Sequence, residues 1–428
     1  MSVLGSTAGM GKDFPNWYQP TNLGISHESD AENDLSLGDT DIEPPETFRE
    51  PQTVLDKFEG AEHKYSEIEG RPETRKAVAE RWLQSNRFED PIDVPETDDG
   101  KQCIVLTPGG QAAMHHAVNA ALEWGETALL IEPYYPYHRK SVRIFDQNRR
   151  ITCVQAGPES GFQPPISAIE SAVRTNSVGA LVLCSPGNPT GVCYDDDWLA
   201  GVAEVARRHD LLVVSDEVYA FLTYADTTHR SIATYPGMSE RTFVVGSFSK
   251  VFGLSGWRIG FVRFPERYFE PLVDVTDAVA MQSATVSQYL LEHALCEEEA
   301  LSNIEDVADR FESRLPVLLE PLRASEKITV CEPEGGFYIL PFVEQSYQDP
   351  VENLGGFERA RTQLPDGCTP AAGDCLQWHL LDEADVEGTP GRTFGDAAKP
   401  AVRLAFGQTP IEDLEAAAER IDAALKTF

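Results

Sequence analysis

Short apolar runs alternate along the chain with segments in which apolar residues recur at helical spacing. This alternation predicts βαβ units, hence an α/β fold with a largely parallel sheet. Helices are expected between the strands, for example at 109–124 and 195–210, and the second begins with acids and ends with basic residues, as the helix dipole favours. The predicted strands are CIVLT (103–107), ALLIE (128–132), ITCVQ (151–155), ALVLC (180–184), LLVVS (211–215), TFVVGS (242–247) and IGFVRF (259–264).

The pattern changes near residue 300, where a long amphipathic helix, LSNIEDVADRFESRLPVLLEPLRAS, is followed by shorter strands in GGFYILPF and PAVRLAF. A chain of 428 residues exceeds the size at which one hydrophobic core stops growing. We therefore expect a large domain at 48–298 and a smaller α+β domain at 299–428. Residues 1–47 are rich in Asp, Glu and Pro and are expected to pack on the small domain.

The charge balance excludes several kinds of partner. Asp and Glu number 70 against 35 Lys and Arg, which gives a net charge of -35. The electrostatic field of this negative charge repels phosphate backbones and anionic lipid surfaces. Neither nucleic acid nor a membrane surface is therefore an expected partner. Because the acids are scattered along the chain and Arg outnumbers Lys, the surface suggests salt adaptation; the alternative is an ordinary acidic cytoplasmic protein.

The location is predicted to be cytoplasmic. The first residues show no basic segment followed by an apolar core, and no apolar stretch approaches the roughly 20 residues of a membrane helix. The eight cysteines contain no CxxC pair. Free thiols are therefore expected, and a metal site is not.

Candidate chemistry follows the strands, because ligands of open α/β sheets bind at the carboxyl ends of the strands. Lys250, after the strand 242–247, would by itself be read as an ordinary exposed lysine. Its neighbours change this reading: Arg258 supplies a cation that lowers the pKa of an amine and a forked donor for phosphate, while Ser247 and Ser249 offer two hydroxyl donors. These residues together predict an amine beside an anion site.

Three further places in the sequence indicate ligand binding: the end of a buried strand, the start of a helix and an arginine in an apolar run. Asp216 ends the buried strand LLVVS, where an unpaired acid is costly; the alternative is a helix N-cap. Gly110 and Gln111 open a helix after a glycine turn, and such backbone N–H groups bind anions. Arg403 lies in the apolar run PAVRLAF, where a guanidinium needs an anion such as a substrate carboxylate or a structural salt bridge.

S-x-S-K at 247–250, followed by G-x-x-G-W-R-I-G at 253–260, resembles the lysine signature of class I/II aminotransferases. These are fold type I enzymes of the aspartate aminotransferase superfamily, which use pyridoxal 5′-phosphate (PLP). The resemblance implies a seven-stranded, mostly parallel sheet between helices, with a smaller α+β domain. It also implies that Lys250 holds PLP as a Schiff base and acts as general base during turnover.

The same resemblance assigns the other residues of the site. Asp216, in D-x-x-Y, would hold the pyridine nitrogen; Tyr219 and Asn188, the latter in N-P-T-G, would bind the 3′ oxygen; and Tyr135 would stack on the ring. The phosphate would take Gly110, Gln111, Ser247, Ser249 and Arg258.

The remaining assignments concern the substrate and the partner subunit. Tyr65 matches a tyrosine that reaches the phosphate of the neighbouring subunit, which implies a homodimer with shared active sites. Arg403 would bind the substrate's α-carboxylate, and the backbone of Gly38 would lie over the substrate; an ordinary turn glycine is the alternative. Arg392 departs from the family, which usually has a small residue there. It lies either near the distal end of the substrate or in solvent.

The implied activity is transfer of the amino group of an L-amino acid to a 2-oxo acid, commonly 2-oxoglutarate. On the same scaffold a PLP-dependent lyase or a cyclising synthase is the alternative, because fold does not decide reaction. A PLP-binding regulator with a DNA-binding head is another, but it needs a basic helix-turn-helix pattern ahead of residue 35, which the sequence lacks. No arginine here matches the one that binds a distal carboxylate in dicarboxylate-specific members.

Overall fold

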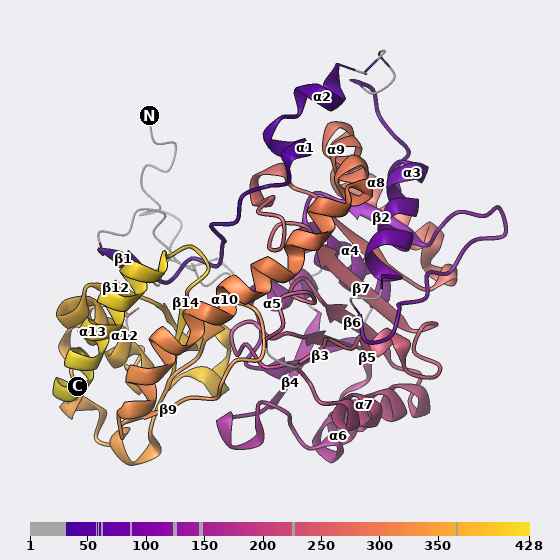
Figure 1. Cartoon of the computed structure of the whole chain (residues 1–428). Helices are drawn as coiled ribbons and strands as arrows, with labels where there is room; N and C mark the ends of the chain where they lie inside the picture. The colour runs from indigo at the N-terminus through magenta and orange to yellow at the C-terminus, as the bar shows by residue number, and fades with distance from the viewer. Residues whose placement is uncertain are drawn as a thin grey trace, which may run out of the picture.

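A seven-stranded sheet lies at the centre of the computed structural model, in the order β2-β8-β7-β6-β5-β3-β4 (Figure 1). The structure describes residues 31–428 except 57, 59, 61–62, 86–87, 123–125, 145–148, 225–226 and 365–366. All seven strands lie where the apolar runs predict them, with ends that differ by two residues at most. They are β2 (Ile104–Thr107), β3 (Thr127–Glu132), β4 (Arg150–Gln155), β5 (Val178–Cys184), β6 (Leu212–Asp216), β7 (Thr242–Ser247) and β8 (Gly260–Arg263).

The predicted mostly parallel sheet is confirmed, with β8 as its exception. Neighbouring strands pair in parallel from β4 through β3, β5 and β6 to β7. β8 runs antiparallel to both β7 and β2. The connection between β7 and β8 contains only a short 3₁₀ turn, Ser255–Trp257, so it lacks the crossover helix that a parallel return needs.

Helices cover both faces of this sheet, because its strands are apolar on both sides. Ala128 and Leu130 of β3 pack in one cluster with side chains of α4 and α8, whereas Leu129 and Ile131 pack with α6 and α7 on the other face. Such two-sided burial is typical of parallel strands. The helices are α4 (Gly110–Ala121), α5 (Pro136–Arg143), α6 (Ile166–Asn176), α7 (Asp196–Arg208) and α8 (Phe269–Ala280).

The C-terminal part holds smaller sheets around α10 (Glu298–Ala324), the long helix that runs diagonally across Figure 1. Strand β1 (Asn33–Asp34) pairs with β12 (Val386–Glu387), so the described N-terminal residues pack on this part. We propose that the boundaries of the large domain lie after residue 47 and after residue 298. The other elements here are β9 (Ile328–Thr329), β10 (Tyr338–Ile339), β11 (Phe342–Val343), α11 (Phe357–Gln363), α12 (Ala372–Ala384), β13 (Thr389–Pro390), β14 (Val402–Ala405) and α13 (Ile411–Thr427).

A third group of helices packs at the β2 side of the sheet. These are α1 (Glu46–Arg49), α2 (Gln52–Leu55), α3 (Pro72–Ala77), which continues as a π-helix at Val78–Leu83, and α9 (Thr285–Cys296). Among the described residues, no helix combines the length and apolar composition that crossing a membrane requires. All eight cysteines are free thiols, as predicted.

Candidate active site

A cavity lies at the carboxyl ends of the parallel strands, with about 730 Å³ of atom-free space, part of it open to solvent. Its volume lies within the usual range of small-molecule sites. Segments that are distant in sequence meet there, as the sequence predicts. Ten predicted site residues line it: Gly110, Gln111, Tyr135, Asn188, Asp216, Tyr219, Ser247, Ser249, Lys250 and Arg258.

One end of the cavity is built for an anion. The first intrahelical bond of α4 runs from Ala113 N to Gly109 O, so the N–H groups of Gly110 and Gln111 remain available at the positive end of the helix dipole. Gly109 has a φ of 84°, and a Cβ there would lie 2.6 Å from the guanidinium of Arg258. Glycine therefore allows the helix start and this arginine to share one space.

Ser247 and Ser249 complete the anion end. Both are buried, their Oγ atoms lie 3.0 Å apart, and Ser249 N donates to Ser247 Oγ at 3.2 Å. Arg258 is oriented by bonds to Ser255 O at 2.8 Å and Pro108 O at 3.2 Å. Two hydroxyls, a helix start and a guanidinium thus surround a position that suits a phosphate.

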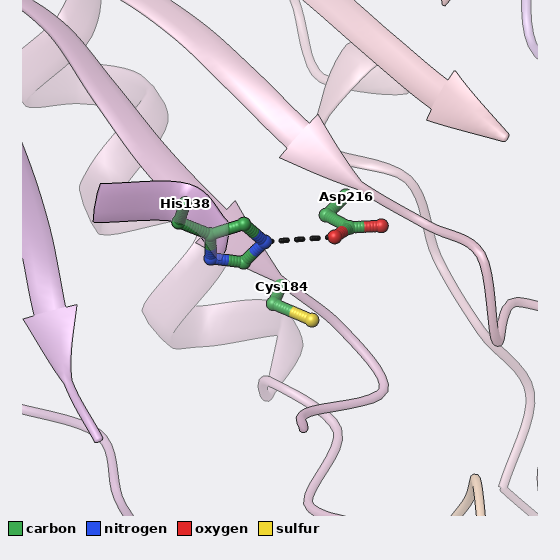
Figure 2. Close-up of side chains that lie close together, drawn as sticks. All are labelled: His138, Cys184 and Asp216. Atoms are coloured by element: carbon green, nitrogen blue, oxygen red, sulfur yellow. Dashed lines mark hydrogen bonds and ion pairs between the residues drawn. The ribbon is translucent and has the colours of Figure 1, made fainter. Parts of the chain in front are cut away.

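An acid lies at the other end. Asp216 is buried at the end of β6, and its Oδ2 lies 2.8 Å from Nε2 of His138, a residue of α5 (Figure 2). Sequence reasoning missed His138 as well as Cys184, which lies beside the pair; the only signal was the position of His138 three residues after Tyr135. His138 fixes the orientation of the carboxylate, and Asp216 Oδ1, which accepts from Val218 N at 3.4 Å, can accept a further bond from a ligand in the cavity.

His138, Cys184 and Asp216 have the donor types of a transition-metal site, with ligand atoms within 4.8 Å of one another. Burial raises the pKa of the Cys184 thiol well above its ordinary value, and the charge of Asp216 raises it further. The carboxylate of Asp216 suits a cationic N–H donor such as a protonated ring nitrogen.

Lys250 lies between the two ends. Its Nζ donates to Gly38 O at 2.6 Å and lies 3.7 Å from Asp39 Oδ1. Burial lowers the pKa of Lys250, and the cations Arg403 and Arg258 lower it further, against the opposing effect of Asp39. A lowered pKa gives a larger fraction of neutral, nucleophilic amine near neutral pH.

Arg403 is a buried cation without an anionic partner. Among the described residues no carboxylate lies within ion-pair distance of it. Its guanidinium donates to Asn188 Oδ1 at 3.1 Å, Ser36 O at 2.5 Å and Thr389 Oγ1 at 3.1 Å, and its buried Nε has no partner. Nε–H and one N–H of Nη1 have no partner among the described residues, so this buried cation still has donors for an anion.

The aromatic residues and Gly38 shape the space around these charges. Tyr219 OH lies 2.7 Å from Tyr338 OH, and the Tyr338 ring also faces Arg403 at 4.7 Å. A Cβ on Gly38 would lie 2.5 Å from Tyr338 OH, which explains a glycine at this position. Tyr135 lines the cavity, whereas Tyr65 does not and is 77% exposed.

Arg392 does not simply face solvent, because it pairs with a buried acid. Its guanidinium bonds both carboxylate oxygens of Asp374, with Nε 2.5 Å from Oδ1, and also Thr369 O at 3.2 Å. Asp374 is buried and begins α12, where its carboxylate also accepts from Ala371 N. The fork geometry and the buried acid explain this position, so Arg392 is a structural residue.

We expect Arg392→Leu to lower the free energy of unfolding by about 3 kcal/mol, because it leaves the Asp374 carboxylate buried and unpaired. Urea denaturation measures this loss, and the KM for amino acids should not change. Arg361→Leu is the control, since Arg361 pairs with Glu358 at the surface and should contribute about 0.5 kcal/mol or less. A raised KM with unchanged stability would instead place Arg392 near the substrate.

This fold and cavity define the class of protein. The family described as aminotransferase class I and II matches residues 31–421, and the chain belongs to this family. It is a transaminase, of a family of PLP-dependent enzymes.

Proteins of similar sequence and similar structure are also named aminotransferases. The chain is 31% identical over 393 residues to the aspartate aminotransferase of Pyrococcus abyssi, which covers 92% of this chain and 91% of the relative. It is 30% identical, with the same coverage, to the aromatic-amino-acid aminotransferase 2 of Thermococcus litoralis. Among solved structures, the aromatic aminotransferase from Pyrococcus horikoshii OT3 matches with a TM-score of 0.77 and 29% identity, covering 94% of this chain and 97% of that one.

The aspartate aminotransferase from Thermus thermophilus with maleate matches with a TM-score of 0.75 and 29% identity, covering 91% of each chain.

The site itself fits PLP. It offers an anion cradle at α4, a buried carboxylate for a ring nitrogen and an amine between them. A side chain at residue 109 or 110 would fill the cradle, because a Cβ on Gly110 would lie 3.0 Å from Ser247.

Proposed function

We propose that this protein transfers the amino group of an L-amino acid to a 2-oxo acid, with 2-oxoglutarate as the acceptor and with PLP held by Lys250 as a Schiff base. One observation carries the proposal: Lys250, Asp216 and Arg258 line one cavity with the start of α4, as a pyridine ring with a phosphate requires. The rival reactions on this scaffold, elimination and cyclisation, have no comparable support, since the relatives above are named aminotransferases.

The proposed cofactor contacts use the two ends of the cavity. Asp216 would pair with the ring nitrogen, and Tyr219 and the amide of Asn188 would donate to the 3′ oxygen. Because Asn188 Oδ1 accepts from Arg403, the amide nitrogen of Asn188 is the atom left to donate. Tyr135 would lie against the ring. The phosphate would be held by Gly110, Gln111, Ser247, Ser249 and Arg258.

The protein's part in the reaction follows from its charges. When bound, the cofactor supplies a cationic ring that accepts the electron pair released at the substrate's Cα. Arg403 binds the α-carboxylate through its positive charge and its N–H groups, and so orients Cα towards Lys250. The neutral amine of Lys250 takes the proton from Cα at its Nζ, as a general base. Gly38 confines the substrate from the side of the N-terminal segment.

Single amino acids added to the PLP form test this function. A donor should convert the PLP form into the pyridoxamine form, which the loss of the PLP absorbance measures, and release a 2-oxo acid. Adding 2-oxoglutarate alone should then restore the PLP form and yield glutamate. Release of ammonia without a pyridoxamine form would contradict transamination. Aspartate and the aromatic amino acids are the first donors to test, because the relatives act on these by name.

Arg403→Lys should raise the KM for amino acids about tenfold, because an ammonium group lacks the fork that binds both carboxylate oxygens. Steady-state kinetics with amine substrates that lack a carboxylate are the control, since their KM should not change. An unchanged KM for amino acids would contradict the role of Arg403. Arg420→Lys is a matched variant, because Arg420 lies away from the cavity and bonds Ala384 O.

We also propose a homodimer in which Tyr65 of one subunit reaches the phosphate of the other. The 77% exposure of this tyrosine is compatible with the proposal, since its side chain is accessible to a second subunit. Eight free cysteines support a cytoplasmic location, and the net charge of -35 supports salt adaptation.

A further inference from the structure

The segment Ser36–Asp41 bonds to both functional cations of the site. Ser36 O accepts from Arg403, and Gly38 O accepts from Lys250. The end of the segment is fixed, because Asp41 binds Arg314 and Arg310 of α10 and its N–H donates to Gly407 O at 3.1 Å. Asp39 therefore lies on a backbone that is held in place on either side.

The carboxylate of Asp39 faces Lys250. Asp39 Oδ2 accepts from Ser255 Oγ at 2.9 Å, which fixes the side chain, and Oδ1 lies 3.7 Å from Lys250 Nζ. Among the largest influences on the pKa of Lys250, Arg403 and Arg258 lower it and Asp39 raises it. Asp39 thus favours a protonated Lys250, against two arginines and burial.

We propose that Asp39 is a positioning residue for Lys250. Together with Gly38 O it receives the ammonium group of Lys250 whenever the lysine is not bonded to the cofactor. This inference rests on the proposed function. During turnover the C–H bond at Cα breaks, its electron pair stays with the cofactor-bound substrate, and the proton forms a new bond to Lys250 Nζ. The negative charge of Asp39 then compensates the new positive charge.

The competing explanation is that Asp39 has only a structural role. Its bond to Ser255 links the segment Ser36–Asp41 to the β7–β8 connection, which also contains Lys250. Asp39→Asn separates the two roles. Asparagine keeps an oxygen that accepts from Ser255 but removes the charge. Asp39→Glu is the conservative variant that restores the charge. Glu43→Gln is the control close to this segment, because the Glu43 side chain is 82% exposed and pairs with Arg49 at the surface.

The first test uses the protein without cofactor. Lys250 is reductively methylated across a pH series, and mass spectrometry measures labelling of this one lysine. Only the neutral amine reacts, so the labelling midpoint follows the pKa of Lys250. We expect Asp39→Asn to move the midpoint to lower pH, whereas Asp39→Glu and Glu43→Gln should keep it near the wild-type value. An unchanged midpoint in Asp39→Asn would overturn the proposal.

The second test uses the loaded enzyme and a donor deuterated at Cα. We expect Asp39→Asn to slow proton removal about tenfold and to increase the isotope effect, with KM unchanged. Wild-type values for both would overturn the proposal. Borohydride reduction of the wild-type enzyme separates this outcome from a failure of the proposed function. If the reduction does not fix PLP on Lys250, the proposed function fails, whatever Asp39 does.

Discussion

Replacing Lys250 with alanine is expected to lower transamination at least about a thousandfold, because it removes both the covalent attachment of PLP and the general base. No other amine takes its place among the cavity-lining residues that the structure describes, since Lys250 is the one lysine there. The rate of the half-reaction with a saturating donor measures the loss. The protein should still fold and bind PLP through the phosphate cradle and Asp216.

Lys399→Ala is the control for this prediction. Lys399 lies at the surface and pairs with Asp396, so its loss should leave the half-reaction rate at the wild-type value. Equilibrium dialysis with PLP would show whether Lys250→Ala keeps the cofactor. Appreciable turnover by Lys250→Ala would refute the role of this lysine and, with it, the assignment of the signature.

Asp216→Ala should lower the half-reaction rate by a factor of about 1000. A charge pair at about 4 Å with an effective dielectric near 20 contributes about 4 kcal/mol, which sets this size. Without the carboxylate the ring nitrogen loses its proton and the ring accepts electrons poorly. His138 also loses the partner that holds it, at 2.8 Å, so the affinity for PLP should fall as well.

Asp210→Asn is the matched control, because the Asp210 side chain is 88% exposed and pairs with Arg241 away from the cavity. Its half-reaction rate should equal that of the wild type. A second measurement, the pH dependence of the absorbance of bound PLP, should show in Asp216→Ala that the ring nitrogen deprotonates at lower pH. A wild-type rate in Asp216→Ala would mean that the carboxylate does not face the ring.

The sequence predicted the sheet well because all its strands except the partly exposed edge strand β4 are buried on both faces. Runs such as ALLIE and LLVVS contain no polar alternation, and each appears in the structure as a central strand. The direction of β8 was not predicted. The connection between β7 and β8 has no helical pattern, so the absence of a crossover helix was the available signal.

The candidate site was predicted where residues belong to motifs. Lys250, Asp216 and Asn188 follow strands directly, and strand ends of a parallel sheet meet at one edge. His138 and Asp39 were missed, because each acts on another side chain rather than through a motif of its own. The partner of Arg392 was missed for the same reason: Asp374 lies 18 positions earlier in the chain, and only the packing of α12 brings the two together.

The antiparallel pairing of Ser247 with Gly260 closes the connection that contains Lys250 and Arg258. Lys250 and Arg258 therefore lie on one loop whose two ends are held together by this pairing. An insertion or deletion within 248–259 would shift one of these residues relative to the other. Attempts to evolve new substrate preferences should leave this loop at constant length. Variation is better directed at Tyr137, which lines the cavity and lies outside this loop.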